Sequence, residues 1–175
     1  LGALLDVRDN LLTDFHRDVD RLAQTVRDRV NAAHNQGTVG NELQTSITGS
    51  RAFPASAPGS DAIDPAQVSG ELTLIATDGT NETPYPINLD GFTGTTVAAL
   101  ASHMNGQVGG PGNTPFDASG GQLVITPPSG ETAIGLDVGD AQVGGALNRT
   151  ATIPPSSTNF SHYFGLNDLY VRSEE

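Results

Sequence analysis

The sequence predicts an α+β protein, in which a long N-terminal amphipathic helix packs against a C-terminal aromatic segment and carries a small inserted antiparallel β domain. Apolar residues recur every three or four positions across residues 11–37, which is typical of a helix with one apolar face. From residue 70 the pattern alternates with a period of two, which indicates strands. The chain has 21 Gly and 11 Pro but only 5% aromatic residues, so short strands and tight turns are favoured over a large catalytic domain.

The expected helix belongs to a helical stem over residues 1–37. Its apolar stripe consists of Leu12, Phe15, Val19, Leu22, Val26, Val30 and Ala33. Such a stripe needs a partner, because helices in proteins owe most of their stability to packing of the apolar face. Thr13 and Asp14 predict an N-terminal cap or a restart near residue 13, and Gly37 predicts a left-handed C-terminal stop.

The predicted partner of the stripe is the aromatic segment over residues 159–171. It belongs to a return segment, residues 144–175, that is expected to pack on the stem. Spacings of three and four also suit a seam between subunits. Internal packing is favoured for Leu22, Val26 and Val30, whereas Leu5 and Leu12 are left open between the two. Isolated from the terminal helices of a longer protein, the chain is predicted to be monomeric, and a concentration-dependent dimer would indicate a seam instead.

Between the two ends, residues 38–69 are predicted to form an irregular connector and residues 70–143 a β-rich domain. The domain is expected to run strand, strand, helix, strand, strand, with the helix covering one face of the sheet. The first two strands should form a hairpin, because Asp78-Gly79-Thr80-Asn81 has the residues of a hairpin turn. These strands and the helix are expected at residues 71–76, 85–89, 95–107, 115–118 and 122–126, and a further strand is expected at residues 133–138. Pro84 and Pro86 should confine the second strand to a sheet edge, because proline cannot donate to the ladder.

Composition excludes several functional classes. Eight basic residues against 20 acidic ones give a net charge of −12, which disfavours binding to nucleic acid or to anionic membranes. The absence of cysteine removes disulfides and thiolate metal sites. No apolar run approaches the roughly 18 residues of a membrane span. Because the chain starts at Leu1 rather than Met, it is expected to be a fragment of a longer protein.

No catalytic, cofactor-binding or metal site is predicted. The four histidines, at positions 16, 34, 103 and 162, are scattered singly and lack the spacing of metal ligands. The sequence holds neither a phosphate-binding loop nor a nucleophile elbow. His34 and His162 are instead expected to hydrogen-bond locally where the two ends of the chain meet.

Two stretches resemble the bacterial flagellar hook-associated protein 1 family, which forms the junction between hook and filament. The residues that carry the resemblance are Leu22, Ala23, Val30, Asn31, His34, Gly37, Phe160, His162, Phe164, Gly165, Leu166, Asn167, Asp168 and Leu169. The first group looks like a helix that ends in an Asn-x-x-His-x-x-Gly pattern, and the second like that family's Phe-Gly-Leu-Asn-Asp segment. Residues 70–139 are similar to the insertion motif of flagellin-type axial proteins.

The resemblance implies a structural, non-enzymatic protein without cofactors, exported by the flagellar type III apparatus to the extracellular flagellum. It also implies contacts with the hook protein, the second junction protein and further copies of itself. An export chaperone would bind regions outside this chain. The alternative reading is a secreted adhesin or another surface-binding β module, and a hydrolase with an unrecognised site is a distant third.

Overall fold

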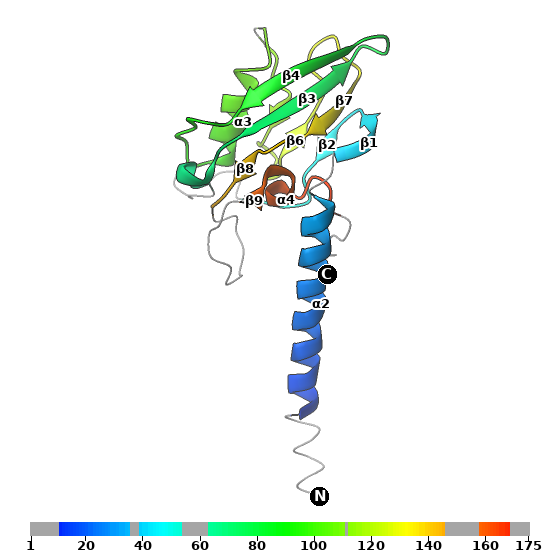
Figure 1. Cartoon of the computed structure of the whole chain (residues 1–175), viewed down its shortest axis with the longest axis vertical. Coiled ribbons are helices and arrows are strands. Elements are labelled where there is room, and N and C mark those ends of the chain that lie inside the picture. Colours follow the sequence, from blue (N-terminus) through cyan, green and yellow to red (C-terminus); the bar gives the residue numbers. More distant parts are fainter. Residues whose placement is uncertain (1–10, 36–38, 54–62, 111, 146–157, 169–175) are drawn as a thin grey trace, which may run out of the picture.

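The computed structural model describes residues 11–35, 39–53, 63–110, 112–145 and 158–168. One helix, α2 (Leu12–His34), projects from a β-rich body that contains the other described elements (Figure 1). The body consists of antiparallel strands and short helices. The predicted α+β class is therefore confirmed.

The helix α2 begins and ends close to the predicted positions. Asp14 lies in its first turn as expected, but the capping position is Leu11, which makes no side-chain cap bond. At the other end, the backbone N–H of Asn35 donates to the carbonyl oxygens of Asn31 and Ala33. The predicted stop at Gly37 lies outside the described residues.

The larger sheet has four antiparallel strands in the order β1-β7-β3-β4. Its strands are β1 (Val39–Gln44), β7 (Ala133–Asp137), β3 (Glu71–Thr77) and β4 (Glu82–Asn88). The hairpin of β3 and β4 was expected, and β4 lies at the edge as Pro84 and Pro86 predict.

The prediction of an irregular connector over residues 38–69 is wrong in part. This region supplies β1, the two-residue strand β2 (Ile47–Thr48) and a 3-10 turn, η2 (Pro65–Gln67). The strand β1 pairs with β7, which lies about 90 positions further along the chain. Because that pairing is non-local and β2 is very short, no alternating pattern marks either strand in the sequence.

Two smaller sheets complete the body. The first has the order β2-β6-β5, with β6 (Val124–Ile125) and β5 (Phe116–Asp117), and the second pairs β8 (Gln142–Val143) with β9 (Thr158–Asn159). Two helices pack with them, α3 (Val97–Asn105) and α4 (Phe160–Phe164). Thr96 caps α3 by accepting a hydrogen bond from the backbone N–H of Ala99.

The hydrophobic core lies within the body. It combines the inner face of β3 with α3 and α4 through fully buried side chains, among them Leu72, Leu74, Leu100, Met104, Phe160 and Phe164. Of the residues described, none from α2 belongs to this core. None of the described helices combines the length and the apolar character that a membrane span requires. The stem therefore gains no stability from the core of the body.

Candidate functional site

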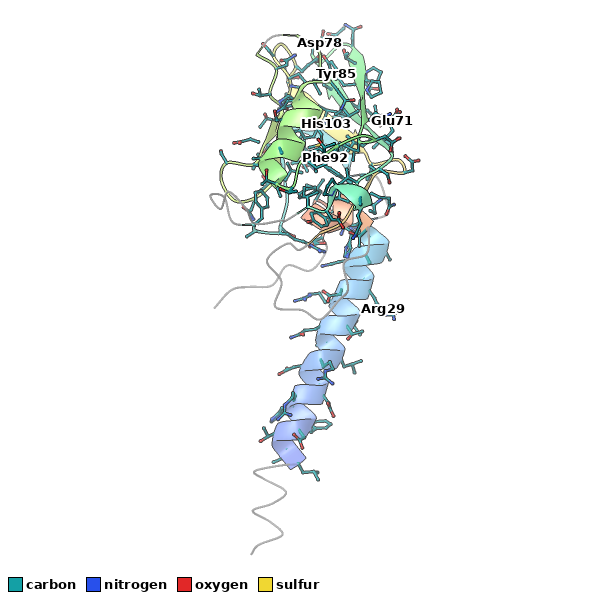
Figure 2. All side chains as sticks on the ribbon, turned by 90° about the vertical axis from the view of Figure 1, so that its left-hand side faces the viewer. Arg29, Glu71, Asp78, Tyr85, Phe92 and His103 are labelled. Carbon is teal, nitrogen blue, oxygen red and sulfur yellow. The ribbon has the colours of Figure 1, made fainter. Side chains whose placement is uncertain are left out.

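The stripe of α2 is exposed to solvent over most of its length. Phe15, Leu22 and Val26 keep 61%, 63% and 53% of their surface accessible, and Leu12 and Val19 are also exposed. Figure 2 shows the side chains of α2, including that of the labelled Arg29, standing clear of the body. In the part of the chain that the structure describes, the only large exposed hydrophobic residue outside this helix and its first flanking residue is Leu43.

The predicted internal packing of the stripe is therefore wrong for Leu22 and Val26. Val30 is half-buried, Leu12 is exposed, and Leu5 lies outside the described residues. The physical reason is the position of α4. Its phenylalanines turn into the core of the body, so the described part of the aromatic segment, residues 159–168, meets α2 at its last turn.

The contact between the last turn of α2 and the body is made by polar side chains, and we call it the joint. Its residues are Asn31, His34, Asn35, Ser50, Arg51, Ser161, His162, Asn167 and Asp168. They come from three segments that are far apart in the sequence. Asn31, Asn35 and Ser161 are buried, which is uncommon for polar residues and requires that their hydrogen bonds be satisfied.

Asn35 is the centre of the joint. Its side-chain Nδ2 donates to Oδ1 of Asp168 at 2.7 Å and to the carbonyl oxygen of Asn31 at 2.8 Å. Its Oδ1 accepts from the Ser161 hydroxyl at 2.7 Å and from the backbone N–H of Asn167 at 3.1 Å. The amide thus makes all the hydrogen bonds available to it, and it connects the stem to three residues of the return segment.

Asp168 joins the third segment to the other two. Its side chain is only 6% exposed; Oδ2 accepts from the Ser50 hydroxyl at 2.7 Å, and Oδ1 lies 3.6 Å from Nη2 of Arg51. Two backbone bonds align the same segments, from Ser50 N–H to the Gly165 oxygen and from Arg51 N–H to the Phe164 oxygen. The nearby guanidinium and the donated hydrogen bonds compensate the desolvation of this carboxylate.

His34 confirms the prediction of a local hydrogen bond where the ends meet. Its Nδ1 lies 2.6 Å from the carbonyl oxygen of Asn167, and Nδ2 of Asn167 donates to the carbonyl oxygen of His34 at 3.1 Å. His162 also lies at the joint, but its Nδ1 accepts from Arg51 of the middle segment at 3.2 Å. The other two histidines lie elsewhere, His16 on the exposed stem and His103 on α3 beside Phe92.

Gly165 provides the turn that brings the return segment to the joint. It ends α4 in the left-handed conformation, with φ of 66°. A Cβ at this position would clash with the hydroxyl of Ser50 and would lie 2.7 Å from Oδ2 of Asp168. Only glycine fits both the backbone conformation and the close approach of the two segments.

The residues that resemble the hook-associated family lie in two places, at or near the joint and on the exposed stem. Those that lie at the joint, or in the adjoining turn and core, are Asn31, His34, Phe160, His162, Phe164, Gly165, Leu166, Asn167 and Asp168. Leu22 and Ala23 are exposed on the stem, and Gly37 and Leu169 lie outside the described residues. The sequence did not single out Ser50 or Arg51, because two polar residues in a loop carry no periodic signal.

The chemistry of the joint is that of a structural connection. Within the described ranges, no three histidine, cysteine or acidic side chains gather as metal ligands would. In comparisons with known proteins, no family profile, no curated protein and no solved structure matches the chain.

Proposed function

We propose that this chain is a structural component of the bacterial flagellum, an axial junction protein that joins the hook to the filament. In this role α2 is a stem that packs among the helices of the axial assembly, and the β-rich body projects from it. The proposal includes no catalytic step and no cofactor.

The observation that carries the proposal is the joint. The two stretches that resemble the hook-associated family meet there directly, since Asn35 and Asp168 are 133 positions apart and share a hydrogen bond of 2.7 Å. A paired helix end and return segment is what an insertion between two axial segments requires. An adhesin domain needs no such pairing with a projecting helix.

The exposed stripe is a second support. Apolar side chains that remain in water along a helix of 23 residues indicate a surface that is covered in an assembly. The partners expected for an axial protein of this kind are the hook protein, the second junction protein and further copies of the chain. An export chaperone would act on regions outside this chain before secretion by the flagellar type III apparatus.

Immunogold labelling of isolated flagella tests the proposal. An antibody raised against the β-rich body should label the junction between hook and filament. A strain that lacks the gene should show no label and should have hooks without filaments. Label spread over the cell surface, with none at the junction between hook and filament, would overturn the proposal and favour a surface adhesin.

A further inference from the structure

We propose that the stripe of α2 is the docking surface for α2 of a second copy of this chain, and that the two helices pair antiparallel. The inference depends on α2 alone and does not rest on the proposed function. It concerns the free chain in solution, whereas copies in an axial assembly share one direction and would cover the stripe with other helices. Its starting point is the correction above, since a stripe that the body leaves open is available to another molecule.

The spacing of the stripe is that of a two-helix seam. Leu12, Phe15, Val19, Leu22 and Val26 follow one another in steps of three, four, three and four. This is the a and d pattern of two heptads, in which each apolar side chain inserts between residues of the facing helix. Arg29 interrupts the pattern before the joint, and the next apolar residue, Val30, is already half-buried. The seam therefore ends short of the body and leaves space for a partner helix.

The residues beside the seam do not oppose pairing of identical helices. The flanking positions are His16, Asp18, Ala23 and Thr25. Asp18 is the only carboxylate among them, and none is Arg or Lys. In an antiparallel pair in which Val19 faces Leu22 of the second copy, Asp18 lies nearest to Thr25 of that copy and not to a second Asp18. All four residues are exposed and are free to line an interface.

Charge identifies the partner as a second copy rather than a charged protein. The helix α2 holds four Arg and four Asp, so it is neutral, whereas the residues after His34 hold 14 acidic residues and three Arg, a net charge of −11. A neutral apolar stripe does not select a strongly basic or acidic partner. In a strongly acidic chain, α2 is the surface on which two copies meet with the least repulsion.

Charge also sets the direction of the pair. Residues 12–22 carry three Asp and two Arg, a net charge of −1, and residues 23–34 carry two Arg and one Asp, a net charge of +1. An antiparallel pair in which Val19 faces Leu22 of the second copy places residues 12–18, with two Asp and one Arg, beside residues 23–29, with two Arg and one Asp. The pair also opposes the two helix dipoles favourably. It also holds the acidic bodies at opposite ends of a stem about 34 Å long, well beyond the Debye length of about 8 Å at physiological salt. A parallel pair would place both bodies at the same end.

Two heptads make a small interface, so the pair should be weak and reversible, with a dissociation constant on the order of 10 µM. Sedimentation equilibrium of the 175-residue chain from 2 to 200 µM measures this directly. The mass should rise from the 18.1 kDa of one chain towards twice that value. A chain that remains monomeric at 200 µM would overturn the proposal.

Matched variants locate the interface. Val19→Glu and Leu22→Glu place a charge in the seam and should weaken association at least tenfold. Gln24→Glu adds the same charge on the outward face of the same helix and should leave association unchanged. Circular dichroism checks that each variant keeps its helix. Dimerisation of Val19→Glu with the strength of the unmodified chain would exclude the stripe as the interface.

Single spin labels decide the direction, since the chain has no other cysteine. In an antiparallel pair in which Val19 faces Leu22 of the second copy, labels at Asp20→Cys should lie close to each other. Labels at Asp28→Cys should lie about 22 Å apart along the pair, because Asp28 is then level with Thr13 of the second copy, 15 residues from its own Asp28 at 1.5 Å each. Short distances at both positions would show a parallel pair and overturn the assigned direction.

Discussion

Asn35 shows how a single amide can hold a helix to a domain that shares no core with it. All its hydrogen-bonding capacity is used within the joint, and it is fully buried. Replacement of either partner in such a network leaves buried polar groups without hydrogen bonds, which costs more than the bond itself contributes. The joint therefore depends on each of its members.

Asn35→Ala should lower the free energy of unfolding of the body by about 2–3 kcal/mol, because Ser161 and Asp168 each lose a buried hydrogen bond. Urea denaturation followed by tyrosine fluorescence measures the change, since Tyr163 is buried in α4. Gln24→Ala, on the exposed part of the same helix, is the control and should change stability by less than about 0.5 kcal/mol. Equal effects of the two substitutions would contradict a structural role for Asn35.

Gly165→Ala and Gly91→Ala separate backbone strain from close approach. Both glycines have positive φ, 66° and 78°, so both substitutions carry a strain of about 1–2 kcal/mol. A Cβ at Gly91 meets nothing within 4 Å, whereas one at Gly165 meets Ser50 and Asp168. Gly165→Ala should therefore be the more destabilising by at least about 1 kcal/mol in thermal unfolding. If Gly165→Ala destabilised the chain less than Gly91→Ala, the joint would accommodate the added methyl group without loss of stability.

At the scale of elements, the hairpin of β3 and β4 is closed by a turn that a carboxylate stabilises. Asp78 Oδ1 accepts hydrogen bonds from the backbone N–H groups of Thr80 and Asn81, each at 2.7 Å. These bonds favour the charged form, first from Asn81 and then from Thr80, and lower the pKa of Asp78 below its ordinary value. The turn predicted at residues 78–81 is thus formed by the residue types that indicated it.

The lowered pKa of Asp78 predicts how the turn responds to acid. A carboxylate whose pKa is lower in the folded chain than in the unfolded chain stabilises the fold at any pH above its unfolded-state pKa. This stabilisation is lost as the pH falls through the folded-state pKa. The difference in stability between the unmodified chain and Asp78→Ala should be constant near neutral pH and should shrink below about pH 4. Urea unfolding of both proteins from pH 7 to pH 2.5 measures it. A difference that stays constant to pH 2.5 would show that the carboxylate is not the stabilising group.

The elements that sequence reasoning found are those with local signals. The spacing of apolar residues predicted α2 and α3, the turn residues predicted the first hairpin, and two prolines predicted the edge position of β4. The elements it missed, β1 and β2, exist only through pairing with distant strands. In the joint, His34 was expected and Arg51 was not, because the contacts of a loop residue follow from the fold around it.

At the scale of the whole molecule, the joint is what couples the stem to the body. The described core contains no residue of α2, and the contacts between described residues of the stem and the body lie at its last turn. Removal of the outer stem therefore exposes no core residue. The stem acts as a projecting arm whose own apolar side chains are stabilised only when another molecule covers them.

A chain that lacks residues 1–29 should keep a folded body, because Asn31 and Asn35 remain to complete the joint. Its free energy of unfolding should stay within about 1 kcal/mol of that of the full chain. Far-UV circular dichroism should show the loss of the helix, and sedimentation should show a monomer at every concentration. A body that unfolds after this truncation would show that the stem contributes to its core.

The sequence by itself determined that a long helix with one apolar face precedes a β-rich region, because helix and strand periodicities and turn residues are local properties. It also located the two stretches that meet. Tertiary structure alone decided how they meet, through buried polar groups at the last turn of α2 and not along its stripe. In the sequence, a stripe that packs inside the chain and a stripe that forms a seam between subunits have the same spacing. Spacing shows which side chains share a face of the helix but not what covers them. The phenylalanines of α4 are buried in the core of the body, so they do not cover the stripe, and its apolar side chains remain exposed.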